Sequence, residues 1–174
     1  IQRVMSLSAA VRLDEAAEAL EHAKRATEGV EDPSALIGIS MAEHFVLLGS
    51  GRLKESFALA EKTSELARRV GSSQAAYATV QAGSVAALLG DYEASIAFFA
   101  EALRLAEESH QPYHAARAAS GLVGRYAQVG RDDEYIDQMK AKAIAHLKAP
   151  MGTMTASSVY GELGWAALEA GRDE

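Results

Sequence analysis

Two histidines four positions apart, His110 and His114, are the first residues whose type and spacing could do chemistry. Imidazoles at this spacing on one helical face can bind a metal ion. Pro112 lies between them in a predicted connection, so we expect them not to share a face, and no acidic third ligand follows at a recognisable spacing. The sequence therefore predicts no metal site. The other histidines are expected at the surface or partly packed within helices: His22, His44 and His146.

A run of carboxylates, Asp132-Asp133-Glu134, could be imagined as a cation site. The run opens a predicted helix, where negative charge complements the helix dipole. Asp14 and Glu15 occupy the matching helix start in the first unit, which favours a structural role for both acidic groups. The sequence has no phosphate-binding lysine loop, no nucleophile elbow and no His-Glu-x-x-His motif. It also lacks cysteine, which excludes thiolate chemistry and Cys-based zinc sites. We expect no enzyme activity and no cofactor.

A block of small and aromatic residues recurs about every forty positions. This recurrence predicts the helices that would position any functional site. It is clearest from Gly90 to Leu103, and Gly51, Gly130 and Gly171 begin the other copies, with Val11 in the corresponding place of the first. A fixed period between about 20 and 50 residues indicates a repeat array. Arrays present surfaces more often than catalytic centres.

Composition and periodicity together predict an all-α chain. Of the 174 residues 49% are hydrophobic but only 6% aromatic, and alanine supplies much of the apolar part. Residues at gaps of three and four form one helical face, Tyr92, Ser95, Ile96, Phe99, Ala102, Leu103 and Ala106. Equivalent stripes begin at Leu13 and Leu53, and further helices are predicted over 34–48, 73–89, 113–129 and 153–170. Glycine turns separate them, so each unit is a pair of antiparallel helices.

The net charge and the two ends of the chain give further expectations about partners, location and domain organisation. A net charge of −7 without a dense basic run argues against direct contact with nucleic acid, and no apolar run approaches the ~20 residues of a membrane span. We expect a cytoplasmic protein. Residues 3–10 and 171–174 each hold part of a repeat, so we expect 1–174 to be a single helical-repeat domain within a longer multidomain chain. Its apolar ends could support self-association.

The stretch from Gly83 to Leu103 resembles a tetratricopeptide repeat, with a small residue in the first helix, Gly90-Asp91-Tyr92 at the turn, and Ser95, Phe99 and Ala102 in the second helix. Tyr160, Leu163, Gly164 and Ala167 match in the last unit. The resemblance implies a right-handed α-α superhelix of about four antiparallel helix pairs. The period is near 40 rather than the standard 34, and units of that length resemble the sensor region of MalT-like regulators, ATP-dependent bacterial transcription activators of the LuxR class.

The fourth unit departs from this pattern, since Val123, Tyr135 and Lys142 occupy positions that are small elsewhere. Bulk there would hold its two helices apart. The departure either shapes a groove or reflects ordinary drift with local repacking.

The resemblance also implies a concave face lined by the first helix of each pair, which would receive a peptide, a protein or a small effector. The leading hypothesis is the sensor part of a bacterial regulator; the alternatives are an interaction or oligomerisation scaffold and an accessory domain of an enzyme. Asparagine is absent, which disfavours an adaptor that clamps chaperone C-termini. Carried onto this sequence, the groove positions are Tyr77, Val80, Ser84, Arg117, Ser120, Gln128, Ser158 and Trp165.

Overall fold

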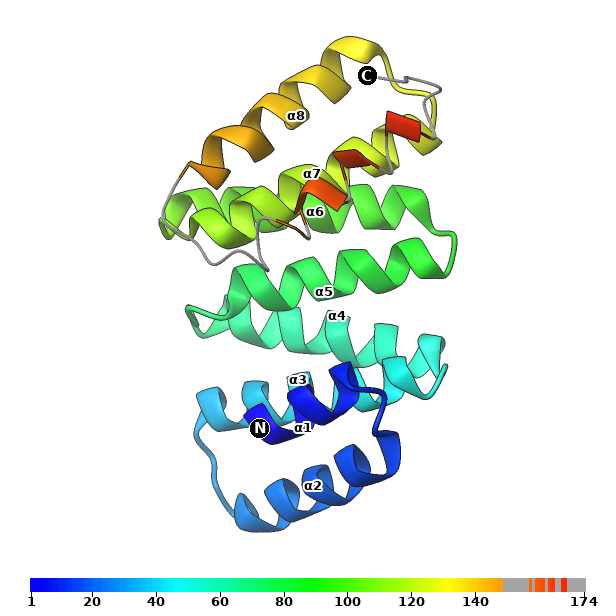
Figure 1. Cartoon of the computed structure of the whole chain (residues 1–174). Coiled ribbons are helices and arrows are strands. Elements are labelled where there is room, and N and C mark those ends of the chain that lie inside the picture. The colour runs from blue at the N-terminus through cyan, green and yellow to red at the C-terminus, as the bar shows by residue number, and fades with distance from the viewer. Residues whose placement is uncertain (149–156, 158, 162, 165–166, 169–174) are drawn as a thin grey trace. The chain divides into compact units, whose positions relative to one another are not determined.

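The structure, a computed structural model, describes residues 1–148, 157, 159–161, 163–164 and 167–168. Within these residues it contains helices and no strand, which confirms the all-α prediction (Figure 1). Short turns join successive helices. The helices are α1 (Gln2–Ala9), α2 (Leu13–Ala26), α3 (Pro33–Gly49), α4 (Leu53–Arg69), α5 (Ala75–Leu88), α6 (Tyr92–Glu108), α7 (Pro112–Gln128) and α8 (Asp133–Leu147).

Contacts divide the chain into two compact units, Ile1–Ala78 and Thr79–Glu174. In the first unit α1 packs on α2 and α3, and α3 packs on α4. In the second, α7 lies against both α6 and α8. Consecutive helices are therefore the packing partners, as a repeat requires. The single domain and the right-handed superhelix stay predictions.

The turns that end the first helix of each pair confirm the forty-residue register. Gly51, Gly90 and Gly130 have φ of +73°, +79° and +68°, in the left-handed region that glycine enters at little cost. Val11 takes the same conformation in the first unit, with φ of +58°, although a β-branched residue rarely does. The hydrogen bonds agree, since Arg12 donates its backbone N–H to Leu7 as Arg52 does to Leu47, both at 2.9 Å.

In the connections between helix pairs, too, a residue with positive φ is glycine in most units and another residue in one. Gly29 and Gly71 have positive φ, and His110 replaces glycine at the equivalent point with φ of +54°. The next helix begins within four residues of this point, at Pro33 in α3 and at Pro112 in α7. Proline suits this first helical position because its missing N–H would have no partner there.

Helix α6 buries the predicted stripe, with Ser95, Ile96, Phe99, Ala102, Leu103 and Ala106 inside and Tyr92 half-buried. Helix α4 buries Ser56, Ala60, Thr63, Ser64 and Ala67. Ser64 is the member that the periodicity did not predict. In the first unit the apolar core consists of Val4, Leu7, Ala16, Leu20 and Ala42.

The prediction that bulky residues hold the two helices of the fourth unit apart is wrong for Tyr135 and Lys142. Both are exposed, and α8 buries Ile136 and Ala143 instead, one position further along. The Tyr135 ring contacts the Tyr126 ring edge to face at 6.1 Å between centroids. Tyr135 therefore contacts α7 only from an exposed position, and the smaller residues Ile136 and Ala143 take the buried positions of α8.

A serine–carbonyl hydrogen bond holds one helix pair together in each unit. Ser95 of α6 donates to the carbonyl of Gly83 in α5 at 2.8 Å. One repeat earlier, Ser56 of α4 donates to the carbonyl of His44 in α3 at 3.3 Å. We call these two bonds the hydroxyl clamps. They fix the rotation of the second helix of the pair against the first, because each serine is fully buried.

The ring of Phe99 fills the space that two glycines leave in the second unit. A Cβ built on Gly121 of α7 would lie 2.7 Å from the ring, and one on Gly83 of α5 would lie 3.3 Å from it. Both neighbouring helices are therefore shaped around this one aromatic side chain.

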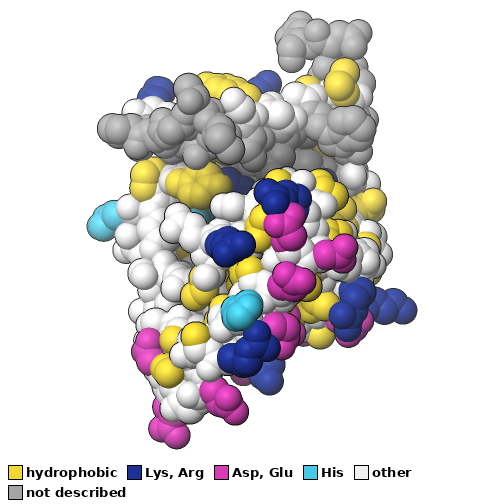
Figure 2. All heavy atoms as spheres, turned by 60° about the horizontal axis from the view of Figure 1, so that its bottom comes forward, with side chains coloured by type: hydrophobic (Ala, Val, Ile, Leu, Met, Phe, Trp, Pro, Cys, Tyr) yellow, Lys and Arg dark blue, Asp and Glu magenta, His cyan; other side chains and the backbone are white. Residues whose placement is uncertain are grey.

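Figure 2 shows acidic and basic side chains interspersed on one face, without a patch of a single sign. Arg12 pairs with Glu15 and Arg52 with Glu55, each at 2.5 Å within one helical turn. None of the helices in the described part of the chain is long and apolar enough to cross a membrane.

Candidate functional site

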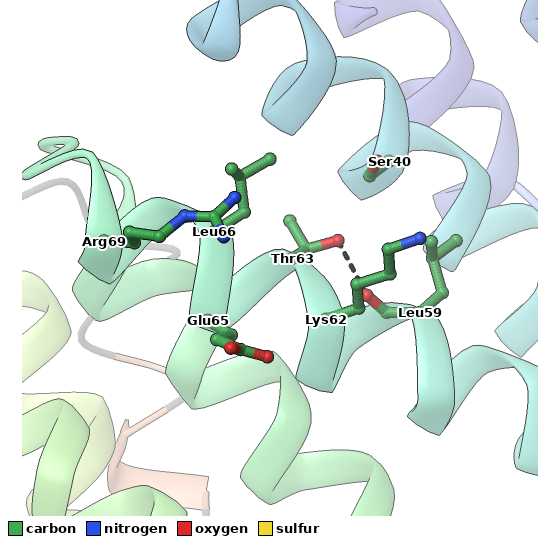
Figure 3. A pocket seen from close by; sticks show the side chains of 7 residues that line it. All are labelled: Ser40, Leu59, Lys62, Thr63, Glu65, Leu66 and Arg69. Atoms are coloured by element: carbon green, nitrogen blue, oxygen red, sulfur yellow. Dashed lines mark hydrogen bonds between the residues drawn. The ribbon is translucent and has the colours of Figure 1, made fainter.

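A hollow of about 230 Å³ opens between α3 and α4 in the first unit (Figure 3). Ser40 reaches it from α3, and every other lining residue comes from α4. Because residues of α4 at gaps of three, four and seven share a face, one helix supplies a continuous wall. The α4 residues are Leu59, Lys62, Thr63, Glu65, Leu66 and Arg69.

The wall has a cation toward each end, and one carboxylate, Glu65, also lines it. Leu66 and Thr63 lie between Lys62 and Arg69 in Figure 3. Thr63 is only 3% exposed, and its hydroxyl donates to the carbonyl of Leu59 at 2.7 Å, which leaves its lone pairs available as acceptors. The hollow thus combines partly buried leucine surface with two solvent-facing cations.

Neither Lys62 nor Arg69 makes an ion pair with another described residue, unlike Arg12 and Arg52 on the same unit. Glu65 lies three positions after Lys62 and four before Arg69, spacings at which helical side chains can pair. Its carboxylate instead extends away from Ser40 in Figure 3. Arg69 also lies in the last turn of α4, where its charge complements the helix dipole.

A histidine–serine pair next to this region is structural. His44 is fully buried, contrary to the expectation that it would lie at the surface or be only partly packed. Its Nδ1 lies 3.0 Å from Ser56 Oγ and 3.3 Å from the Ser56 carbonyl oxygen. All three bonds of the pair are satisfied when Nδ1–H donates to Ser56 and the serine hydroxyl donates to the His44 carbonyl. A nucleophilic serine also needs a path for substrate, and neither Ser56 nor His44 is exposed to solvent.

A second cluster joins α6 to α8 in the second unit. Lys142 Nζ lies 2.9 Å from Glu107 Oε1, and His146 Nε2 lies 3.4 Å from the same oxygen. The hydrogen bond from Lys142 lowers the pKa of the Glu107 carboxyl, and His146 lowers it further. A hollow of about 260 Å³ beside them is lined by Ala106, Glu107, His110, Gln111, Pro112 and His146. Because Lys142 and His146 both contact the Glu107 carboxylate, we interpret this cluster as a link between α6 and α8.

The two histidines with metal-like spacing are separated as expected. His110 lies in the connection before α7, whereas His114 lies within that helix and is half-buried. Burial lowers the pKa of His114 to about 4, and the nearby charge of Arg117 adds to this effect. Across the described residues, no group of three His, Cys, Asp or Glu side chains is placed to hold a metal ion.

The predicted groove residues are distributed over two helices of the described structure. On α5, Tyr77 and Ser84 are half-buried, Val80 is fully buried, and the Ser84 hydroxyl donates to the Val80 carbonyl at 2.9 Å. On α7, Arg117 and Gln128 are half-buried and Ser120 is 1% exposed. Val80 and Ser120 therefore pack inside the protein. Ser158 and Trp165 lie outside the described residues.

Scans against protein-family models and against curated proteins find no match to this sequence. Among solved structures, the chain is similar to BtubC (BKLC) from P. vanneervenii, with a TM-score of 0.74 and 18% sequence identity. The alignment covers 98% of this chain and 75% of that one. At this identity the likeness shows a shared helical fold and nothing about a ligand.

Sequence reasoning did not find the hollow between α3 and α4, because it looked for ligand contacts on the first helix of each pair. The signal was present in the second helix, where Lys62 and Arg69 stand two turns apart on either side of Leu66. On a helix that spacing puts both cations on one face.

Proposed function

We propose that this chain is a non-catalytic binding domain of the helical-repeat type, which recognises a small effector, a peptide or a protein. The hollow between α3 and α4 carries the proposal, because it offers apolar surface beside two cations that have no ion-pair partner among the described residues. Sites that bind small molecules combine these two features, an apolar wall and a few polar groups that orient the ligand.

The hydroxyl clamps support the same proposal. The buried polar groups of His44, Ser56 and Ser95 are used in bonds between helices, so the polar interior serves rigidity. A rigid repeat scaffold with an open, charged hollow suits recognition, since a preorganised site binds at a lower entropic cost.

Within this proposal, the specific context is the sensor part of a MalT-like bacterial transcription regulator. The repeat length near 40 and the resemblance of 83–103 to tetratricopeptide repeats support that context. Ligand binding would then shift the regulator between two conformations. The coding sequence on either side of this segment tests the context: a nucleotide-binding motif upstream and a helix-turn-helix downstream are expected, and flanks that hold further repeats alone would overturn it.

Binding itself can be tested by NMR. Uniformly ¹⁵N-labelled protein would be titrated with a library of small acids, amines, sugars and acidic, basic and apolar peptides. We expect at least one class to shift a contiguous set of backbone amides in a saturable way. An absence of saturable shifts from every class, or consumption of a library compound, would refute a non-catalytic binding domain.

A further inference from the structure

We propose that the hollow between α3 and α4 binds a small α,ω-dicarboxylate, a molecule with an acidic group at each end of a short apolar chain. This inference rests on the proposed function and names the ligand class of the same site. The argument uses the spacing of the cations, the nature of the wall between them and the volume of the hollow.

Lys62 and Arg69 set the distance between the two acidic groups. A spacing of seven residues on a helix that rises about 1.5 Å per residue separates their Cα atoms by about 10 Å along α4. The ammonium and the guanidinium lie on the same side of the helix in Figure 3. An extended nine-carbon dicarboxylate such as azelate is of about this length, so each end can meet one cation.

The surface between the cations suits a hydrocarbon chain. Leu59 and Leu66 are half-buried, and the Thr63 hydroxyl is already bonded within α4. A methylene chain laid against the leucines removes apolar surface from water and leaves no buried polar group without a partner. A polar linker, such as a sugar or a peptide backbone, would lose this gain.

The volume admits a chain of this length. A hollow of about 230 Å³ is many times the roughly 10–15 Å³ that one water needs by the same measure. Azelate has seven methylene groups between its carboxylates, which can lie at the rim of the hollow. A net charge of −7 repels anions from the protein as a whole, so selectivity for a dianion must come from these two local cations.

Glu65 provides an internal check on the electrostatics. It lines the hollow and could reach Lys62 or Arg69 by a change of rotamer, in which case it would compete with the ligand. Removing its charge should therefore strengthen binding rather than weaken it.

The experiment is a backbone-amide NMR titration of the whole chain at low salt with succinate, adipate, azelate, dodecanedioate and the monoacid nonanoate. Azelate or its nearest homologue is expected to bind most tightly and to shift α3 and α4 amides, and nonanoate to bind about fivefold more weakly. Lys62→Gln and Arg69→Gln should each weaken azelate about fivefold while leaving nonanoate much less affected. Glu65→Gln should tighten azelate, and Lys54→Gln, on the same helix outside the hollow, should change nothing.

Equal affinity across chain lengths, or equal loss in the Lys54 control, would overturn the inference, as would an acidic peptide that binds the hollow where no dicarboxylate does. Circular dichroism of every variant confirms folding, and because all four substitutions are at exposed positions a folded set is expected. If the dicarboxylates fail while another library compound binds, only the ligand class is refuted. If the whole library fails, the proposed function falls with it.

Discussion

Val11 offers a sharp test of the repeat register, because it holds a backbone conformation that the other units give to glycine. A non-glycine residue in the left-handed region costs about 1–2 kcal/mol, whereas glycine adds about 0.5–1 kcal/mol of conformational entropy to the unfolded chain. Val11 is 77% exposed, so its replacement loses little buried surface. Val11→Gly should therefore stabilise the protein by about 1 kcal/mol.

Val70 is the matched control, since it is an exposed valine at the end of α4 with an ordinary φ of −93°. There no left-handed backbone is relieved, so the entropy of glycine and the loss of a side chain that is 43% exposed act in the same direction, and Val70→Gly should destabilise by at least about 0.5–1 kcal/mol. Urea unfolding followed by far-ultraviolet circular dichroism measures both. If Val11→Gly lowers the midpoint as Val70→Gly does, the left-handed turn at Val11 is wrong and so is the alignment of the first unit with the others.

The remaining predictions concern the second unit. Gly121→Ala should destabilise by about 1–3 kcal/mol, because its Cβ would meet the Phe99 ring at 2.7 Å. Gly124→Ala in the same helix meets no atom within 4 Å and should stabilise by up to about 1 kcal/mol; thermal unfolding that gives both variants the same sign would contradict this packing. Ser95→Ala should cost about 1 kcal/mol and raise amide hydrogen exchange in α5 and α6, whereas unchanged exchange would mean that the clamp does not hold the pair. His114, whose pKa falls from 6.5 to about 4 by burial, stays neutral in the folded protein while the unfolded chain takes up a proton. The free energy of unfolding should therefore fall as pH drops from 6.5 to 4, by about 2 kcal/mol once the full 1.36 kcal/mol per pKa unit is reduced for solvent screening. His114→Gln should remove that slope, and an unchanged slope would assign it elsewhere.

The scaffold could be predicted because helix formation and repeat packing are local. Gly90 and the stripe from Ser95 to Ala106 lie within one helix and its turn, so spacing alone identified what is buried. The prediction failed for α8, where Tyr135 and Lys142 rotate outward and Ile136 takes the inner position. The spacing within α8 did contain the answer, since Ile136, Met139 and Ala143 recur at gaps of three and four, but the alignment with the other units indicates the neighbouring positions instead.

The hollow, in contrast, could not be predicted from the spacing of residues within a helix. Its lining pairs Ser40 of α3 with residues of α4, and the free volume between them depends on how closely the two helices approach. The burial of His44 was missed because its partners, the hydroxyl and the carbonyl of Ser56, become neighbours only when the pair folds. Spacing in a sequence predicts faces of helices, but it does not predict the gaps between them.

The hydroxyl clamps have a consequence for how the chain folds. Each joins residues only 12 positions apart in the sequence. Closing so short a loop sacrifices little chain entropy, so each pair can form before any contact with a distant segment. Two independent nuclei would then exist on one chain. A substitution that abolishes the nucleus at Ser56 should slow the folding of its own pair while the pair around Ser95 still forms at its usual rate. A destabilising substitution in one pair would then leave the folding of the other pair unaffected.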